Sequence, residues 1–192
     1  MVEFLTQYWV LLVLVPAVSV GAATDIVRGK IYNKLTYTTV VVALVGQSLF
    51  GGLWGVGGLN VGLVDALGGL ALGGGLLMLA VLAGGLHGGD VKLMAAVGAL
   101  LGWQVTLLAL AYTLVAAAAI SVVLILVRGV FWRTMRRLAG FFVLLLTTRK
   151  PTDPATPDSP QVPFGLAIAI GSLAAAAEVL WRGGWTLPVF RM

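Results

Sequence analysis

The sequence predicts an all-α protein that crosses a membrane about six times. Of its 192 residues, 60% are hydrophobic and only 10% are charged. A soluble domain is about 45–50% apolar and about 25% charged, so this chain has too little charge to cover its surface against water. We therefore expect a single membrane-embedded domain over residues 1–192, with no separate soluble domain.

The first two crossings are predicted from apolar runs over residues 8–23 and 37–50. We expect the first run to remain as an uncleaved span, because Glu3 is the only charge at this end and a signal peptide begins with basic residues. The glycine-rich connection over residues 51–62 is predicted to be a flexible turn region.

Four further crossings follow. The third run, residues 61–83, contains Gly69 and Gly73, and this G-x-x-x-G spacing lets helix backbones approach closely in lipid. The apolar stretch over residues 91–127 is too long for one helix, and we divide it at Gly102-Trp103 into a short fourth and a longer fifth span. The sixth span is residues 164–181.

The stretch between the fifth and sixth spans differs from the rest of the chain. Residues 128–150 mix arginines with aromatic and aliphatic side chains, a pattern typical of an amphipathic segment lying on an anionic leaflet. Residues 151–163 contain five prolines and are predicted to be a loop.

The distribution of basic residues predicts the orientation. Six crossings put loops 25–36, 84–92 and 128–163 on one side, and these loops hold ten of the 12 basic residues. Only Arg182 and Arg191 fall on the other side. Because cytoplasmic loops carry the excess of Lys and Arg, we expect these loops in the cytoplasm and both termini outside.

Composition also excludes several kinds of site. The basic residues form short clusters between apolar runs, without the basic stripe and interleaved aromatics that bind nucleic acid. The chain has no cysteine and one histidine, His87, so we expect no disulfide, thiol nucleophile, metal or cofactor. Four acids are expected to be merely solvated, two in the proline-rich loop and two toward the outer face: Asp153, Asp158, Glu3 and Glu178.

Two other acids stand out by their positions. Asp25 and Asp90 each lie at the predicted cytoplasmic end of a span, so the topology puts them on the same side of the membrane. A single aspartate at such a place is often only a helix cap. Two facing carboxyl groups at short range cannot both ionise easily and share one proton. Such a pair can activate water against a peptide carbonyl while donating a proton to its oxygen.

Glycines precede the second aspartate. Gly88 and Gly89 come directly before Asp90, and glycine allows another backbone to approach closely. A protease needs such an approach to hold its substrate in an extended form.

Three sequence motifs, in the same order along the chain as in a known family, resemble the motifs of that family. Residues 88–99 look like the second aspartate motif of type IV prepilin peptidases, and residues 25–36 look like the first. Pro163-Phe164-Gly165, with Gly171, resembles the segment that opens the family's last span. Two positions depart from the family pattern. His87 replaces the first glycine of Gly-x-Gly-Asp, and Tyr32 replaces the proline before Asn33.

The resemblance implies an aspartic endopeptidase of the bacterial cytoplasmic membrane. It would cut the short basic leader from prepilin-like membrane proteins at the cytoplasmic face, as the short-form peptidases of Flp-type tight-adherence pili do. N-methylation is not expected, since the chain has no cysteine. The implied catalytic residues are Asp25 and Asp90, and the implied substrate-binding residues are Lys30, Asn33, Gly88, Gly89, Lys92, Pro163, Phe164 and Gly165.

Two other classes of function remain open. A small proton-coupled transporter or channel also uses membrane-embedded acids and broken, glycine-rich helices. Asp65, inside the third run, is the best support for that alternative, although we interpret it as an interfacial residue of a first helical turn. A structural assembly subunit would tolerate replacement of Asp25 or Asp90.

Overall fold

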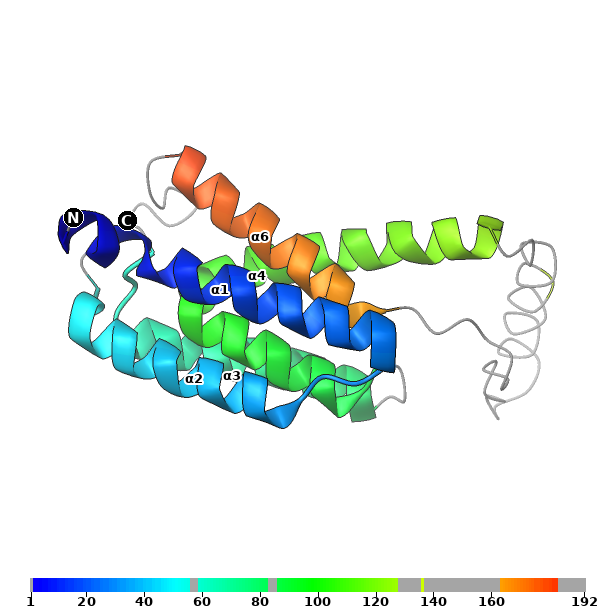
Figure 1. Cartoon of the computed structure of the whole chain (residues 1–192), viewed down its shortest axis with the longest axis horizontal. Coiled ribbons are helices and arrows are strands. Elements are labelled where there is room, and N and C mark those ends of the chain that lie inside the picture. Colours follow the sequence, from blue (N-terminus) through cyan, green and yellow to red (C-terminus); the bar gives the residue numbers. More distant parts are fainter. Residues whose placement is uncertain (1, 56–58, 83–85, 128–135, 137–162, 183–192) are drawn as a thin grey trace, which may run out of the picture. The chain divides into compact units, whose positions relative to one another are not determined.

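The computed structural model describes residues 2–55, 59–82, 86–127, 136 and 163–182, with the backbone alone for residues 2–7. Within these ranges the chain is helical and contains no strand (Figure 1). Its elements are α1 (Val2–Arg28), α2 (Asn33–Gly46), the π-helix η1 (Gln47–Gly51), α3 (Leu63–Leu82), α4 (Gly88–Val127) and α6 (Phe164–Trp181).

The chain divides into two compact units, one of residues 1–116 and 163–192 and one of residues 117–162. All packing discussed below lies within the first unit. The predicted amphipathic segment over residues 128–150 lies outside the described residues except for Arg136, which is helical and exposed. The predicted loop over residues 151–163 is likewise described only at Pro163.

Helix α4 turns back on itself at Gly102. This glycine has φ 75° and ψ 168°, a backbone conformation that side chains disfavour. A Cβ atom added at Gly73 would lie 2.7 Å from the Met94 carbonyl oxygen and 3.2 Å from Thr106 Cγ2. Met94 and Thr106 would be about 18 Å apart along a straight helix, so both can approach Gly73 only if α4 folds back. The break predicted at Gly102-Trp103 is confirmed.

Glycines bring α3 against the first half of α4. A Cβ atom at Gly69 would collide with the carbonyl oxygen of Gly98, and a Cβ atom at Gly98 would collide with that of Gly69. The predicted close approach at Gly69 and Gly73 is therefore confirmed. In lipid, where apolar side chains gain little by leaving their solvent, such backbone contact supplies much of the packing between helices.

This contact predicts a large stability effect. We expect Gly98→Ala to lower the free energy of unfolding by about 3 kcal/mol, because the obstructing atom is backbone and the helices must separate. Denaturant titration of the purified protein in detergent measures the change. Gly75→Ala is the matched control, since a Cβ atom on this α3 glycine meets nothing within 4 Å. Equal stability of the two variants would contradict the close packing.

A buried glutamine ties together the connection between η1 and α3. Gln47 is 0% exposed, and its Nε2 donates to the carbonyl oxygens of Leu59, at 3.0 Å, and Leu100, at 2.7 Å. Its Oε1 accepts the Gly62 N–H at 3.4 Å. The predicted turn is present over residues 52–54, and the glutamine binds two backbone groups of the connection, at Leu59 and Gly62. The flexibility of this connection stays a prediction.

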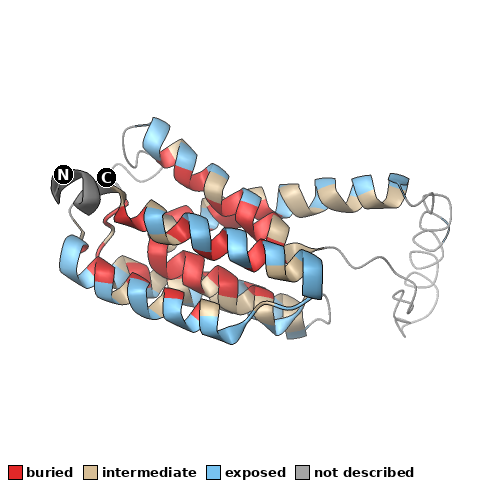
Figure 2. Cartoon of the chain, viewed as in Figure 1, coloured by how far each residue is buried: buried red, intermediate tan, exposed pale blue. Residues whose placement is uncertain are grey.

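The buried residues lie between the helices, and the outward faces are exposed yet apolar (Figure 2). Four helical segments of the described chain are long and apolar enough to cross a membrane: Tyr8–Arg28, Leu63–Leu82, Gly88–Val127 and Phe164–Trp181. Exposed apolar faces are costly in water and ordinary against lipid tails, so this is an all-helical membrane protein. The count of six crossings and the orientation remain predictions.

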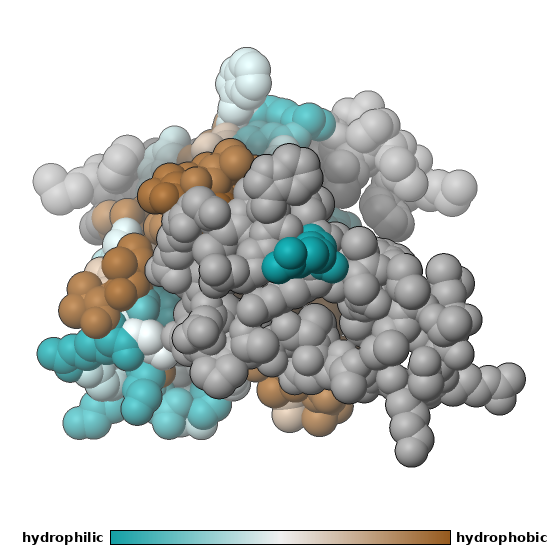
Figure 3. Space-filling view, turned by 90° about the vertical axis from the view of Figure 1, so that its right-hand side faces the viewer, coloured by the Kyte–Doolittle hydropathy of each residue, from teal (hydrophilic) through white to brown (hydrophobic). Residues whose placement is uncertain are grey.

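Hydrophilic side chains gather on part of one end of the molecule. Figure 3 looks onto the end at the right of Figure 1, where they gather at the lower left, beside hydrophobic side chains at the upper left and at the bottom. Helix α1 ends at this end of the bundle (Figure 1). Three basic residues at or after its end are exposed: Arg28, Lys30 and Lys34.

Candidate active site

Asp25 lies in the last turn of α1 and is half-buried. The helix ends after Arg28, where Gly29 adopts a left-handed conformation with φ 60° and donates its N–H to the Asp25 carbonyl oxygen at 2.8 Å. This is the usual glycine C-cap, and it turns the chain sharply toward α2. The cap leaves the side chain of Asp25 free to face a neighbouring helix.

Asp90 lies in the first turn of α4 and is only 4% exposed. Its N–H donates to the His87 carbonyl oxygen at 3.1 Å, and its Oδ2 accepts the His87 N–H at 3.3 Å. The second bond is the reach-back half of a capping box, made here by an aspartate at the third helical position. Asp90 therefore does cap its helix, and the cap orients its carboxyl group.

Asp25 ends α1 and Asp90 begins α4, and the two acids lie near each other. Asp25 is near enough for its charge to act on Asp90. The start of α6 joins them, because the Gly165 N–H donates to Asp25 Oδ2 at 2.7 Å. A Cβ atom on Gly165 would lie 2.9 Å from both the Cβ and Oδ2 atoms of Asp25, so only glycine fits there. Three helix ends thus converge on one pair of acids.

The predicted substrate-binding residues of the α1–α2 loop, α2 and the start of α4 lie near Asp25 and Asp90. Lys92 Nζ donates to Asn33 Oδ1 at 2.8 Å, so these two contact each other. A Cβ atom on Gly89 would lie 3.2 Å from Ile31 Cβ, whereas one on Gly88 would meet nothing within 4 Å. Gly88 therefore borders open space, and Gly89 packs against the α1–α2 loop. Lys30 is exposed in that loop.

The N-terminus of α6 supplies the third predicted motif. Pro163 occupies the N-cap position, followed by half-buried Phe164 and buried Gly165. Six residues on, a Cβ atom at Gly171 would collide with the backbone of Thr113 in α4. Gly165 and Gly171 let α6 approach Asp25 and α4 respectively.

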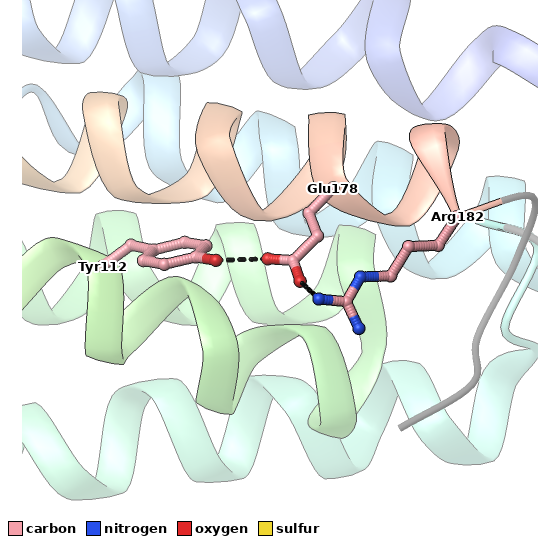
Figure 4. Close-up of polar contacts among 3 residues, drawn as sticks. All are labelled: Tyr112, Glu178 and Arg182. Carbon is pink, nitrogen blue, oxygen red and sulfur yellow. Dashed lines mark hydrogen bonds and ion pairs between the residues drawn. The ribbon is translucent and has the colours of Figure 1, made fainter. Parts of the chain in front are cut away.

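Toward its other end, α6 carries a polar network that sequence reasoning missed (Figure 4). Tyr112 on α4 donates its hydroxyl hydrogen bond to Glu178 Oε2, and Arg182 forms an ion pair with Glu178 Oε1 at 2.5 Å. The Glu178 side chain is 18% exposed, so the expectation that it is simply solvated is wrong. The four-residue spacing of Glu178 and Arg182 indicated their pairing, but nothing in the sequence indicated Tyr112.

No group of three or more His, Cys, Asp or Glu residues in the described ranges is arranged to hold a metal ion. The chemistry of the described cluster is that of two carboxyl groups, held by one N–H each. The absence of a metal or cofactor stays a prediction.

The comparisons with known proteins agree with this cluster. The model of the type IV leader peptidase family matches residues 12–122, a segment that includes both Asp25 and Asp90. The chain belongs to the type IV leader peptidase family. No curated protein and no solved structure matches it.

In this member of the type IV leader peptidase family, the two departures from the expected motifs have local explanations. No described residue other than glycine has a positive φ, so the backbone at position 87 accepts histidine. His87 contributes backbone hydrogen bonds that any residue except proline makes, and its side chain is exposed. Tyr32 accepts a hydrogen bond from Arg28, whose guanidinium carbon lies 5.6 Å from the centre of its ring. Neither departure removes the backbone hydrogen bonds that hold Asp25 and Asp90.

Proposed function

We propose that this protein is an aspartic endopeptidase that removes the leader peptide of type IV or Flp-type prepilins at the cytoplasmic face of the bacterial inner membrane. The observation that carries the proposal is that Asp25 and Asp90 lie at the ends of two helices, near enough for the charge of one to act on the other, in a member of a leader peptidase family. The basic residues of the loops on this side support a cytoplasmic site.

The proposed reaction uses one proton shared by the two carboxyl groups, since close carboxylates do not both ionise easily. The ionised member takes a proton from a water molecule as the water oxygen attacks the peptide carbonyl carbon. The protonated member donates its proton to the carbonyl oxygen. Collapse of the tetrahedral intermediate breaks the C–N bond, and the amine leaves with a proton returned by the pair.

Hydrogen bonds from the backbone orient both acids for this reaction. The N–H of Gly165 holds Asp25 and that of His87 holds Asp90, so the pair is organised before substrate arrives. Catalysis by positioned groups depends on such preorganisation. The open space beside Gly88 supports an approach of the substrate backbone there.

The bilayer is part of the proposed mechanism. A prepilin anchored by its own apolar helix diffuses in the same membrane, and a cut near the membrane surface then needs a site at a helix end. Both Asp25 and Asp90 lie within the last or first turn of their helices. We propose six crossings with both termini outside, which puts the aspartates and ten of the 12 basic residues on the cytoplasmic side.

Co-expression with a candidate prepilin tests the proposal. A prepilin with a C-terminal tag should be shortened in cells that make this protein and stay full length in cells that do not, as measured by immunoblot and by the mass of the new N-terminus. The family resemblance predicts a cut after glycine, so replacing that glycine should block shortening. If the prepilin stays full length although this protein is correctly inserted in the membrane, the result would contradict the peptidase function. Solute or ion flux in proteoliposomes that depends on Asp65 would favour a transporter instead.

A further inference from the structure

The side chain of Lys92, a predicted site residue on α4, makes a hydrogen bond to α2 close to the aspartate pair. It lies on α4, two residues after Asp90, and is half-buried. Its Nζ atom donates to Asn33 Oδ1 at 2.8 Å and lies 5.4 Å from the centre of the Tyr37 ring. Asn33 and Tyr37 are four residues apart on α2, so they present an oxygen and a ring on the same face of that helix.

These two contacts suit an ammonium group well. The hydrogen bond to Asn33 is charge-assisted, and such bonds are about twice as strong as neutral ones. The face of the Tyr37 ring attracts the same charge. Both partners belong to the protein, so the ammonium group is already engaged without a substrate.

A second contact lies beside this one. Gly89 packs against Ile31, where a Cβ atom would lie 3.2 Å from Ile31 Cβ. The loop between α1 and α2 is therefore held to the start of α4 at two points, once through Ile31 and once through Asn33. Asp25 lies at the other end of this loop, so the same contacts set where the end of α1 stands relative to Asp90.

We propose that Lys92 is a positioning residue: through Asn33 and Tyr37 it holds α2 and the α1–α2 loop against α4 and so sets the separation of Asp25 and Asp90. It does not touch the substrate. This inference rests on the proposed peptidase function. The other basic residues near the site do not join α2 to α4 in this way. Arg28 contacts Tyr32, at the end of the same α1–α2 loop, and Lys30 and Lys34 are exposed.

Steady-state cleavage of a prepilin in detergent or nanodiscs gives the first test. We expect Lys92→Met and Asn33→Ala each to lower kcat about tenfold with KM unchanged, the size expected for one lost charge-assisted hydrogen bond. The double variant should be no slower than Lys92→Met alone, because Lys92→Met already removes the bond to Asn33. Lys92→Arg keeps a donor and should restore most of kcat. Lys34→Met removes a neighbouring exposed charge and should change neither constant.

A cross-link gives a second readout that needs no peptidase activity. The chain contains no cysteine, so Ile31→Cys combined with Gly89→Cys creates one defined pair. The expected Cβ separation is close to that of a disulfide. We expect this pair to cross-link readily under mild oxidation and several-fold more slowly when Lys92→Met is added. Lys34→Met should not slow it.

The outcomes separate the two hypotheses. A raised KM for Lys92→Met, with additive losses in the double variant, would show that Lys92 binds substrate and would overturn the positioning role. The positioning role would also be overturned if Lys92→Met left kcat unchanged, or if it left the cross-linking rate unchanged. If the wild-type protein cleaves no prepilin, the proposed function fails by itself, and the cross-linking rate still decides whether Lys92 holds the loop.

Discussion

Asp25→Asn and Asp90→Asn are each expected to reduce prepilin cleavage by about 10³-fold or more, the upper range for loss of a general acid or base. Asparagine has nearly the shape of aspartate, and its carbonyl oxygen can still accept the N–H of Gly165 or His87. Both variants should therefore insert and fold while losing the ability to exchange a proton with water or with the peptide oxygen. Immunoblot of the co-expressed prepilin and single-turnover kinetics in detergent measure the loss.

Asp65→Asn is the matched control for these variants. Asp65 also lies in the first turn of a helix, α3, where the sequence led us to expect an interfacial acid. It has no part in the proposed chemistry, so its replacement should leave cleavage unchanged. Cleavage that persists in Asp25→Asn or Asp90→Asn would exclude the two-aspartate mechanism.

Gly165→Ala is expected to lower kcat by about 100-fold, the cost of misplacing a catalytic group by roughly 1 Å. The added methyl group would lie 2.9 Å from the Cβ and Oδ2 atoms of Asp25 and 3.1 Å from its Cγ atom. Either Asp25 or the start of α6 must then move, and the hydrogen bond from Gly165 to Asp25 is lost or lengthened. Alanine favours helix over glycine, so poor helix formation does not explain such a loss.

The control for Gly165→Ala is Gly75→Ala, the same substitution at a helical glycine whose new Cβ atom meets nothing within 4 Å. It should keep full activity. Comparing kcat of the two variants, after confirming equal membrane insertion, isolates the contact with Asp25. Full activity in Gly165→Ala would falsify the idea that the start of α6 orients this acid.

Much of the site was predictable because its residues obey local rules. An aspartate beside a glycine turn, at the end of an apolar run, lies at a helix end whichever way the helices pack. Gly102 could be recognised as a break because a 37-residue apolar stretch over residues 91–127 exceeds the ~20 residues of one crossing. The close approach at Gly69 followed from the spacing of small residues alone.

Contacts between distant side chains were not predictable in the same way. The bond from Lys92 to Asn33 joins residues 59 positions apart, and that from Tyr112 to Glu178 joins residues 66 apart. The contacts of the connection after α2 also escaped sequence reasoning, since its glycines indicated a turn but not that Gln47 would bind the Leu59 carbonyl oxygen and the Gly62 N–H. Such pairings depend on how helices rotate about their axes, which hydrophobic runs without polar faces do not encode.

The sequence by itself determined that this is a helical membrane protein and that two aspartates lie at helix ends, because apolar runs and glycine turns act over a few residues. The tertiary structure decided what surrounds those aspartates. It brought Gly165 from 140 residues away to donate to Asp25, and it engaged Lys92 with α2. In a bilayer, apolar side chains face lipid as readily as protein, so it is close backbone approach at glycines and a few polar bonds that select one packing.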